Sequence, residues 1–528
     1  MISRTVDAVV VGGGPNGLVA ANALVDAGWD VLLLEAADEV GGAVRTAAVT
    51  APGFRTDLFS AFYPLAAASP VIRGLELDRH GLAWSRAPVV LAHALDNGDA
   101  ALLEADADVT AAGLDAESAG DGDAWLDLVH GWGRVRDDVL DALFTPFPPT
   151  AALTRLLRRA GTRGALDLAR LAMLPVRRLA AERFRGTGGP LLLTGSALHA
   201  DIPPDAAGSG LFGWLLAMLG QDVGFPVPRG GAGMLARALT DRFTAAGGQV
   251  AVRSRVTAVA VAAGRAVGVV TADGTRVRAR SAVLADVSAP TLYRDLLGPR
   301  HVPARVLDDL GSFTWDHPTL KVNWALAEGV PWRAPGAGRA GTVHLGVDLD
   351  GFVRFAADLS VGAFPERPFL LVGQMTTADA TRSPLGTESA WAYTHLPRGR
   401  ASARDLDAHV ARVERALERA APGFMDRVLA RHVQTPRDLE SADANLNGGA
   451  VNGGTSQLHQ QLFLRPTPGL GRPETPVAGL YLASASAHPG GGVHGACGWN
   501  AARAALADAG PAGAVRRRLA RTAWDRLT

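Results

Sequence analysis

The first part of the chain follows the pattern of apolar and polar positions that a β-α-β unit requires. Residues 7–11 end in three valines and are typical of a strand buried in a parallel sheet. Residues 18–27, rich in alanine and leucine, predict a helix that ends at Gly28. Residues 31–34 are wholly apolar and predict a second buried strand. The chain therefore opens with strand, glycine-rich loop, helix and strand.

The loop between the first strand and the helix fits the pattern G-x-G-x-x-G through Gly12, Gly14 and Gly17. The helix that follows would direct free N–H groups and its positive dipole end at a phosphate. Glu35 ends the second strand, where a carboxylate can bond ribose hydroxyls. This context predicts a dinucleotide site. We expect its contacts to include Gly12, Gly14, Pro15, Asn16, Gly17, Glu35 and Ala36.

The same alternation returns in two later regions. Residues 233–246 predict a helix, 249–255 a strand, 257–270 and 275–280 the strands of a hairpin, and a further strand ends at Asp286. Near the C-terminus, residues 480–483 predict a strand, 488–492 a glycine loop, and the chain is helical by Ala501. No β-α-β unit follows that last element, so it is not a second nucleotide fingerprint.

Three stretches between these regions have a biased pattern. Residues 96–127 contain ten acidic residues and no lysine or arginine, whereas 155–185 contain nine arginines and two acids. The basic stretch has an apolar side, so it is either a solvated surface helix or a helix that docks on a membrane or partner. Residues 210–220 are apolar throughout and predict either a buried core helix or the lining of an apolar cavity.

Composition excludes several classes of function. The 52 basic and 52 acidic residues cancel, which argues against nucleic acid as a partner. Cys497 is the single cysteine, so an intramolecular disulfide, a cysteine-cluster zinc site and a two-thiol redox centre are excluded. No metal-binding motif occurs, and no bound metal is expected.

The apolar runs are shorter than the roughly 20 residues that a spanning helix needs. Residues 1–5 lead directly into the first strand without an apolar signal core. We therefore expect a cytoplasmic protein, with peripheral membrane contact left open. Oligomeric state cannot be read from the sequence.

Two further motifs carry a resemblance to known families. Gly41, Gly42 and Arg45 form a Gly-Gly-x-x-Arg segment after Glu35, which resembles the FAD signature of flavin oxidoreductases with a glutathione-reductase-type fold. Residues 488–493, His-Pro-Gly-Gly-Gly-Val, resemble the C-terminal motif of the phytoene (carotenoid) desaturase family. The resemblance extends over about 6–505. Within that family the chain is most similar to the branch named after a pyridine nucleotide-disulfide oxidoreductase domain, although one cysteine excludes disulfide chemistry.

The resemblance implies an α/β fold: a discontinuous, Rossmann-type FAD-binding domain of glutathione-reductase-like fold with an inserted α+β substrate domain. The FAD-binding domain would comprise residues 1–85, 226–300 and 430–528. The substrate domain, with a helical subdomain, would comprise 86–225 and 301–429. Beyond the first motif, the resemblance adds contacts to non-covalent FAD from Gly41, Gly42, Arg45, Val256, Gly491, Gly492 and Val493.

The implied function is an FAD-dependent dehydrogenase or desaturase that removes two hydrogens from an apolar, isoprenoid- or polyene-like small molecule. Because no second dinucleotide fingerprint occurs, reduced flavin would be reoxidised by oxygen or a quinone. Three alternatives stay open. They are C–N oxidation as in flavin amine oxidases, a flavin-dependent isomerase, and a non-catalytic FAD-binding scaffold.

Three residues are candidates for catalysis. Lys321 is the only lysine among 52 basic residues, which indicates either chance survival or a need for a compact ammonium whose pKa shifts on burial. His488 and His494 flank the C-terminal glycine loop and are candidates for acid–base or substrate contact. His199 and His459 are weaker candidates. Cys497 is more readily explained by packing than by covalent attachment of flavin.

Overall fold

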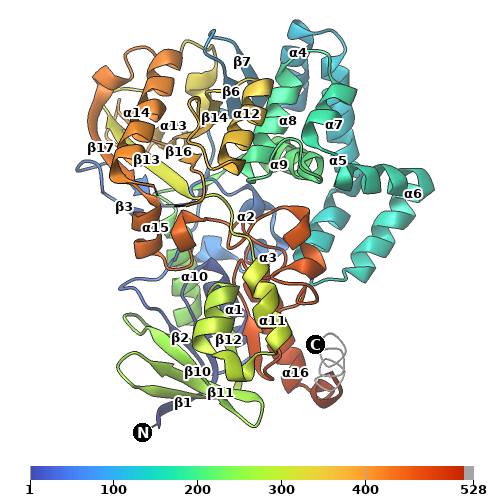
Figure 1. The fold of residues 1–528 in the computed structure, drawn as a ribbon, viewed down its shortest axis with the longest axis vertical. Coiled ribbons are helices and arrows are strands. Elements are labelled where there is room, and N and C mark those ends of the chain that lie inside the picture. Colours follow the sequence, from blue (N-terminus) through green and yellow to red (C-terminus); the bar gives the residue numbers. More distant parts are fainter. Residues whose placement is uncertain (1, 400, 517–528) are drawn as a thin grey trace.

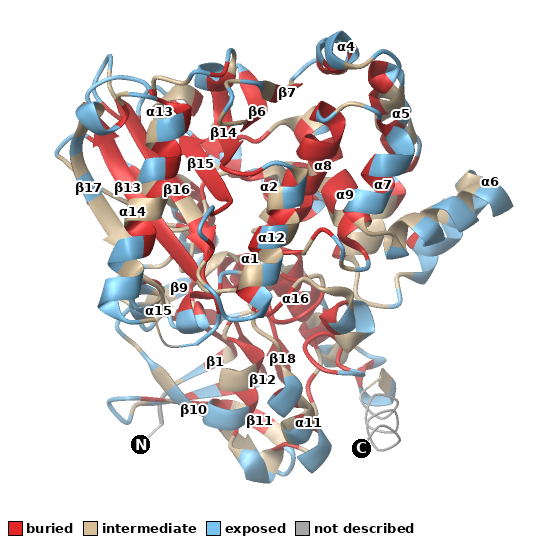
Figure 2. Ribbon diagram, turned by 45° about the horizontal axis from the view of Figure 1, so that its top comes forward, coloured by how far each residue is buried: buried red, intermediate tan, exposed pale blue. Residues whose placement is uncertain are grey.

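The computed structural model describes residues 2–399 and 401–516, so the end of the expected 430–528 segment lies outside the described residues. Two seven-stranded sheets lie toward opposite ends of the long axis of the molecule, with helices packed around each (Figure 1). Figure 2 shows that the strands of both sheets are mostly buried. Each sheet therefore forms the centre of its own core.

The first sheet combines a parallel part with an antiparallel hairpin extension. Its parallel strands are β1 (Ile2–Val11), β2 (Val31–Leu34), β9 (Gln249–Ala251), β12 (Arg276–Ala285) and β18 (Leu480–Leu482). The extension consists of β10 (Val256–Ala262), which pairs antiparallel with β11 (Arg265–Thr271), and β11 pairs antiparallel with the first residues of β12. Val11, Leu34 and Ala285 lie in register. The residues that follow them, Gly12, Glu35 and Asp286, therefore meet at one edge.

Three helices cover one face of this sheet: α1 (Pro15–Asp26), α10 (Gly233–Ala245) and α16 (Ala496–Ala509). The start of α1 packs against α16 so closely that a Cβ on Gly498 would lie 1.9 Å from the carbonyl oxygen of Asn16. Segments nearly 500 residues apart thus come together beside the glycine-rich loop.

Two predicted boundaries differ from the structure for local reasons. The predicted strand 249–255 ends at Ala251, because Arg253 turns with φ +53° and the next residues bond to the chain after β2. The predicted strand 257–270 is two strands, because Ala263 (φ +47°) and Gly264 (φ +74°) form a turn. A further change is that α1 begins at Pro15, three residues earlier than predicted, since proline fits the first turn of a helix.

The second sheet has the strand order β17-β13-β16-β15-β14-β6-β7. It is antiparallel except for the pair β6 and β14. Its strands are β6 (Val89–Ala94), β7 (Ala100–Glu104), β13 (Thr319–Leu326), β14 (Ala340–Leu345), β15 (Leu370–Gln374), β16 (Glu388–His395) and β17 (Val428–Gln434). Two distant stretches of chain therefore build one sheet.

Helices from the first of these stretches form a layer beside the second sheet (Figure 1). They are α4 (Ala107–Glu117), α5 (Asp121–Phe144), α6 (Thr150–Met173), α7 (Val176–Arg183), α8 (Gly188–His199) and α9 (Ser209–Val223). The remaining helices are α2 (Pro64–Ala68), α3 (Pro70–Gly74), α11 (Ala304–Asp309), α12 (Leu349–Ser360), α13 (Met375–Ala378), α14 (Ala403–Ala420) and α15 (Pro436–Ala442). Short strands β3 (Thr46–Ala47) and β4 (Thr56–Asp57) form a local pair, whereas β5 (Trp84–Ser85) pairs with the distant β8 (Val227–Pro228).

The basic stretch forms α6 and α7, and α6 projects from the body of the protein (Figures 1 and 2). Several of its arginines pair with acids: Arg155 bonds Asp138, and Arg170 bonds Glu182. The kink of α6 lies at Gly161, where φ is +64°. Within the described part of the chain, no helix is both long and apolar enough to cross a membrane.

Candidate active site

The glycine-rich loop forms a tight cradle at the edge where β1, β2 and β12 end. Gly12 has φ +97°, a conformation that favours glycine. A Cβ on Gly14 would lie 2.7 Å from Oδ2 of Asp286, and one on Gly17 would lie 2.1 Å from the carbonyl oxygen of Gly12. All three positions therefore require glycine, for turn geometry or for close packing.

Glu35 is fixed beside this loop. Its Oε2 accepts a hydrogen bond from the N–H of Gly13 at 2.7 Å, and its Oε1 accepts one from Ala37 at 2.7 Å. Each carboxylate oxygen keeps a free lone pair for a ribose hydroxyl. The segment just before Val256 runs alongside, since the N–H of Ser254 bonds the carbonyl of Glu35 at 2.7 Å. Val256 itself begins β10.

The Gly-Gly-x-x-Arg segment lies against the glycine-rich loop. The N–H of Gly41 bonds the carbonyl of Gly13 at 2.8 Å, and a Cβ on Gly42 would lie 3.1 Å from the Cα of Gly14. Arg45 donates to the carbonyls of Gly42 (3.0 Å) and Ala442 (2.8 Å). Arg45 thus ties its own segment to the last residue of α15, and it is not a plain surface charge.

One polar atom of the cradle is left for a ligand. Asn16 is 8% exposed, and its Oδ1 is buried without a hydrogen-bond partner at the start of α1. The positive dipole end of α1 lies there and suits an anion, although the N–H of Gly17 is already bonded to Asp286. Together with the carboxylate of Glu35, these groups fit the diphosphate and ribose of a dinucleotide.

A cavity of about 300 Å³ lies between the two sheets, where Ala43 and the C-terminal glycine loop meet the second sheet. Most of its wall is apolar, with Phe212, Leu215, Leu216 and Leu219 of α9 on one side. The polar residues in the wall are Ser60, His199, Thr319, Lys321, Tyr393, Asn452, Ser456, Gln461 and His494. None of the described residues that line the cavity is an aspartate or glutamate. Residues 210–220 therefore both line a cavity and contribute to the core.

Lys321 reaches this cavity from β13, in register with Tyr393 on β16. Its Nζ donates to the backbone carbonyls of Asp57 and, at 3.2 Å, Phe59, and it lies 5.0 Å from the ring centre of Trp391. The side chain is 2% exposed. Burial lowers the pKa of Lys321 to about 7; Asp57 opposes this shift and Arg382 adds to it. The amine can therefore gain and lose a proton near neutral pH.

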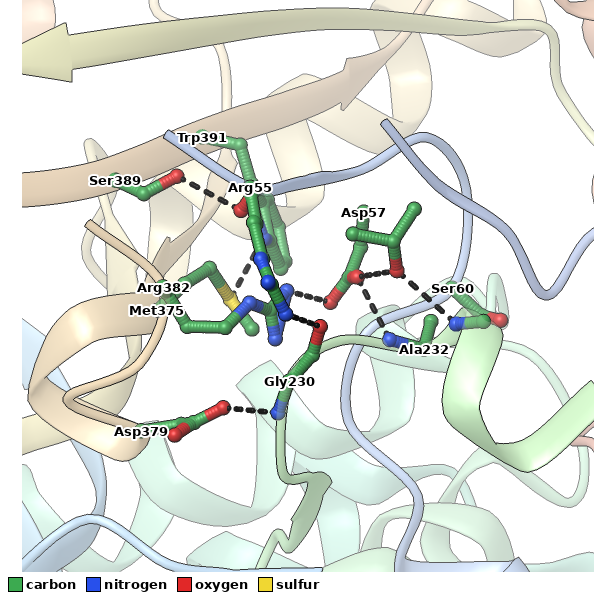
Figure 3. Close-up of polar contacts among 12 residues, drawn as sticks. Arg55, Asp57, Ser60, Gly230, Ala232, Met375, Asp379, Arg382, Ser389 and Trp391 are labelled. Carbon is green, nitrogen blue, oxygen red and sulfur yellow. Dashed lines mark hydrogen bonds and ion pairs between the residues drawn. The ribbon is translucent and has the colours of Figure 1, made fainter. Parts of the chain in front are cut away.

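A buried ion pair lies behind Lys321. Arg382 and Asp57 are both fully buried and joined through Nη2 and Oδ2 (Figure 3). The other carboxylate oxygen of Asp57 accepts from the hydroxyl of Thr46 (2.7 Å) and the N–H of Ala232 (2.8 Å). The pair thus joins β4 and the start of α10 to the turn after α13.

Trp391 and Tyr393 lie side by side on the same face of β16. Their rings are stacked, with centroids 5.9 Å apart and planes 18° apart. The Nε1 of Trp391 donates to Sδ of Met375 at 3.0 Å, which fixes the indole (Figure 3). Rings that stack on each other leave no space between them for a cation, so they do not form a cage for an amine.

The C-terminal glycine loop brings Gly491, Gly492, Val493 and His494 to the cavity wall. Both nitrogens of His494 are engaged: Nδ1 accepts from the N–H of Ala496 (3.0 Å), and Nε2 bonds the carbonyl of Gly490 (3.1 Å). Burial lowers the pKa of His494 to about 4. His494 is therefore neutral in the structure and stabilises the loop through these two hydrogen bonds.

The other sequence candidates lie at different distances from the cavity. The Nε2 of His488 bonds the carbonyl of Thr145 at 3.2 Å, and His488 is not part of the wall. His199 lines the cavity, whereas His459 is exposed. The thiol of Cys497 lies 3.5 Å from the carbonyls of Ala487 and Gly490, as expected for packing. Among the residues that the structure describes, no group of three or more His, Cys, Asp or Glu is arranged to hold a metal.

Sequence reasoning missed the polar residues that act together only in the fold. Arg382 and Asp57 are more than 300 positions apart, and Asp201, His395 and Asn452 come from three separate segments. Asp57 ends residues 52–57, a segment that also resembles the phytoene desaturase family, and that resemblance was the only signal. Pairing between distant segments leaves no local pattern for the others.

Two family models match the chain. Residues 10–74 match the NAD(P)-binding Rossmann-like domain, and residues 163–506 match the flavin-containing amine oxidoreductase family. The first match covers the cradle. The second covers most of the cavity-lining residues, including α9, Lys321 and the C-terminal glycine loop.

Curated relatives extend over nearly the whole chain. Pyridine nucleotide-disulfide oxidoreductase domain-containing protein 2 of Mus musculus is 30% identical, covering 95% of this chain and 93% of that protein. The resemblance to that branch is thereby confirmed. One subunit of the limonene dehydrogenase of Castellaniella defragrans is 23% identical, covering 96% of this chain and 95% of that protein.

Among solved structures, a putrescine oxidase mutant has a TM-score of 0.59 at 17% sequence identity, covering 96% of this chain and 99% of that chain. This likeness shows the fold and confirms the expected α/β architecture around a Rossmann-type cofactor domain. The chain therefore belongs to the flavin-containing amine oxidoreductase family and has FAD as its cofactor.

Proposed function

We propose that the protein is an FAD-dependent dehydrogenase or desaturase that removes two hydrogens from an apolar, isoprenoid- or polyene-like small molecule. The observation that carries this proposal is the cavity wall. It is built largely from aliphatic and aromatic side chains and has no carboxylate among the described residues that line it. Burying an apolar molecule there is favourable, whereas a cationic substrate would lose its hydration without an opposite charge.

Three parts of the chain would hold FAD. The first turn of α1 would bind the diphosphate, Glu35 would bind the ribose, and the C-terminal glycine loop would lie beside the flavin. When bound, FAD supplies the acceptor for a hydride. The residues that line the cavity hold the substrate against the second sheet and exclude water from it. The unprotonated Nζ of Lys321 accepts the second hydrogen as a proton while two of its N–H bonds stay on backbone carbonyls.

C–N oxidation, as in flavin amine oxidases, is the second candidate, and the family match favours it. An amine substrate that binds as a cation needs a carboxylate or an open aromatic cage. Trp391 and Tyr393 are stacked on each other, and Lys321 already lies over the indole ring. The wall therefore supports the apolar substrate better.

Anaerobic mixing of the FAD-loaded protein with limonene, and separately with putrescine, distinguishes the two. We expect limonene or a related terpene to bleach the flavin absorbance and to yield a product lacking two hydrogens. Bleaching by putrescine alone would establish amine oxidation instead. Product that is isomerised without bleaching would identify an isomerase, and FAD uptake without reaction of either compound would leave a non-catalytic FAD-binding scaffold.

Two further parts of the proposal concern partners. Reduced flavin would pass its electrons to oxygen or to a quinone, because the chain shows one dinucleotide fingerprint. Reoxidation of the bleached protein by air, compared with reoxidation by a soluble quinone without air, measures which acceptor is faster.

A cytoplasmic location with peripheral membrane contact through α6 stays a prediction. Separation of the membrane fraction from the cell extract tests it.

A further inference from the structure

The part of the cavity wall that the second sheet forms carries a side-chain hydroxyl without a hydrogen-bond partner. Thr319 begins β13, two residues before Lys321, and it lines the cavity. Its side-chain hydroxyl is buried, with the residue 4% exposed, and has no hydrogen-bond partner. An unpaired buried hydroxyl costs free energy unless a ligand or water satisfies it.

A buried ion pair stands behind this hydroxyl. Thr319 lies directly opposite His395 in the antiparallel pair β13–β16, so their side chains are neighbours on one face. The Nε2 of His395 contacts Oδ1 of Asp201, and both residues are less than a tenth exposed. Burial alone would lower the pKa of His395, but the carboxylates of Asp201 and Asp316 together outweigh it, so the pKa is raised.

Asp201 in turn orients a second residue of the wall. Its other carboxylate oxygen accepts a hydrogen bond from the side-chain amide of Asn452. The backbone of Asn452 is also held, because its N–H donates to Oδ2 of Asp316 at 3.0 Å and its carbonyl accepts from Arg465 at 3.0 Å. The amide of Asn452 is thus fixed, and its Oδ1 lies near the glycine loop, 3.2 Å from where a Cβ on Gly491 would stand.

We propose that Thr319 and Asn452, backed by the Asp201–His395 pair, form a subsite that binds a neutral oxygen group, such as a hydroxyl, at one end of an otherwise apolar substrate. This inference rests on the proposed function and narrows its substrate class. The hydroxyl of Thr319 can donate or accept, and Oδ1 of Asn452 accepts, so an alcohol can bond both.

The charges around the subsite favour a neutral group over an ion. The carboxylate of Asp201 is neutralised by His395 and does not line the cavity. The nearby cations are already engaged, because Arg465 bonds backbone carbonyls that include the one of Asn452, and Lys321 bonds two others. A charged group of either sign would therefore be desolvated here without a free counter-charge.

The test uses limonene and perillyl alcohol, which share a carbon skeleton and differ by one hydroxyl. Each is titrated into the oxidised holoenzyme without turnover, and binding is followed by perturbation of the flavin spectrum or by calorimetry. In the unmodified protein the alcohol is expected to bind more tightly than the hydrocarbon. Thr319→Val removes the hydroxyl with little change of shape, so it should reduce that preference about fivefold, the usual worth of one hydrogen bond.

Thr342→Val is the matched control. Thr342 lies on β14 of the same sheet, is fully buried with an unpaired hydroxyl, and does not line the cavity. This control variant should keep the unmodified ratio of the two dissociation constants. Equal affinities for alcohol and hydrocarbon in the unmodified protein, or an unchanged ratio in Thr319→Val, would overturn the subsite.

The outcome is separable from that of the proposed function. If limonene binds and bleaches the flavin but the alcohol gains nothing, the subsite is wrong and the dehydrogenase proposal stands. If the alcohol is preferred but neither compound bleaches the flavin, the subsite stands and the reaction assignment fails.

Discussion

Two buried carboxylates, one at each end of the site, differ in the groups that stabilise their negative charge. Asp57, behind the cavity wall, faces the guanidinium of Arg382 and accepts two further hydrogen bonds. Asp286, under the glycine-rich loop, accepts one hydrogen bond from the N–H of Gly17 at 2.8 Å. Burial, together with the nearby acids Asp443 and Glu35, raises the pKa of Asp286 to about 8, and only the bond from Gly17 opposes this shift.

The difference separates a structural charge from a titratable one. The charge of Asp57 is compensated within the fold by the guanidinium of Arg382. Asp286 has no basic group among the influences on its pKa, so at neutral pH it is held mostly in the neutral form. The buried pair behind the cavity wall is thus structural, whereas the unpaired acid under the glycine-rich loop responds to pH and to a bound anion.

The largest expected effect comes from breaking the Asp57–Arg382 pair. Asp57→Asn keeps the shape of the side chain but leaves the guanidinium of Arg382 buried without a counter-charge. Removing one partner of a buried pair costs about 3–5 kcal/mol. We therefore expect a marked fall in the free energy of unfolding, measured by urea denaturation of the holoenzyme.

Two comparisons make this prediction specific. Asp167→Asn breaks the exposed pair with Arg163, whose side chains are 90% and 63% exposed, and should change stability by less than about 1 kcal/mol. The double variant Asp57→Asn with Arg382→Met removes the stranded charge and should recover part of the loss. Equal losses in Asp57→Asn and Asp167→Asn would contradict the structural role of the buried pair.

The second largest effect is expected at Lys321, whose Nζ donates to the backbone carbonyl of Asp57. Lys321→Met removes the proton acceptor of the proposed reaction and should slow anaerobic flavin bleaching by about a hundredfold. In the unmodified protein the bleaching rate should rise as pH increases through about 7, because the amine loses its proton there. The variant should show no such rise.

Lys321→Arg serves as the second variant, since a guanidinium keeps the charge but does not release its proton. It should be as slow as Lys321→Met. FAD affinity and stability, measured in parallel, should stay close to the unmodified values. Full activity in both variants would show that Lys321 is not the proton acceptor and that its survival as the only lysine has no catalytic cause.

The cofactor end was predictable from the sequence because its determinants are local. Turn geometry at Gly12, packing at Gly17 and the carboxylate of Glu35 all follow from one strand–loop–helix–strand segment. The contact of Glu35 with the residues before Val256 needed the resemblance to a known fold.

The cavity end was predictable only in part. The lone lysine drew notice to Lys321, and the apolar run 210–220 indicated a cavity or a core. Arg382, Thr319 and Asp201 were missed, since each matters through a partner more than 70 positions away. His488 and His494 were chosen from their motif, yet hydrogen bonds to backbone groups hold both in the loop structure.

The smallest effect sharpens the contrast at the cofactor end. The diphosphate of FAD is anionic, so its binding beside Gly14 and Gly17 favours the neutral form of Asp286, and FAD affinity should fall as pH rises above about 8. At one pH unit above that value the loss should be about tenfold. Asp286→Asn cannot ionise, and its side-chain oxygen can still accept from Gly17.

Its FAD dissociation constant, measured by quenching of FAD fluorescence, should therefore stay level from pH 7 to pH 9, while that of the unmodified protein rises. Asp57→Asn, measured in the same way, should follow the unmodified curve, because Asp57 lies at the cavity end and is not in the cradle. If Asp286→Asn and the unmodified protein lose affinity in parallel, the titrating group lies elsewhere. The difference between a paired and an unpaired buried carboxylate would then not account for the two ends of this site.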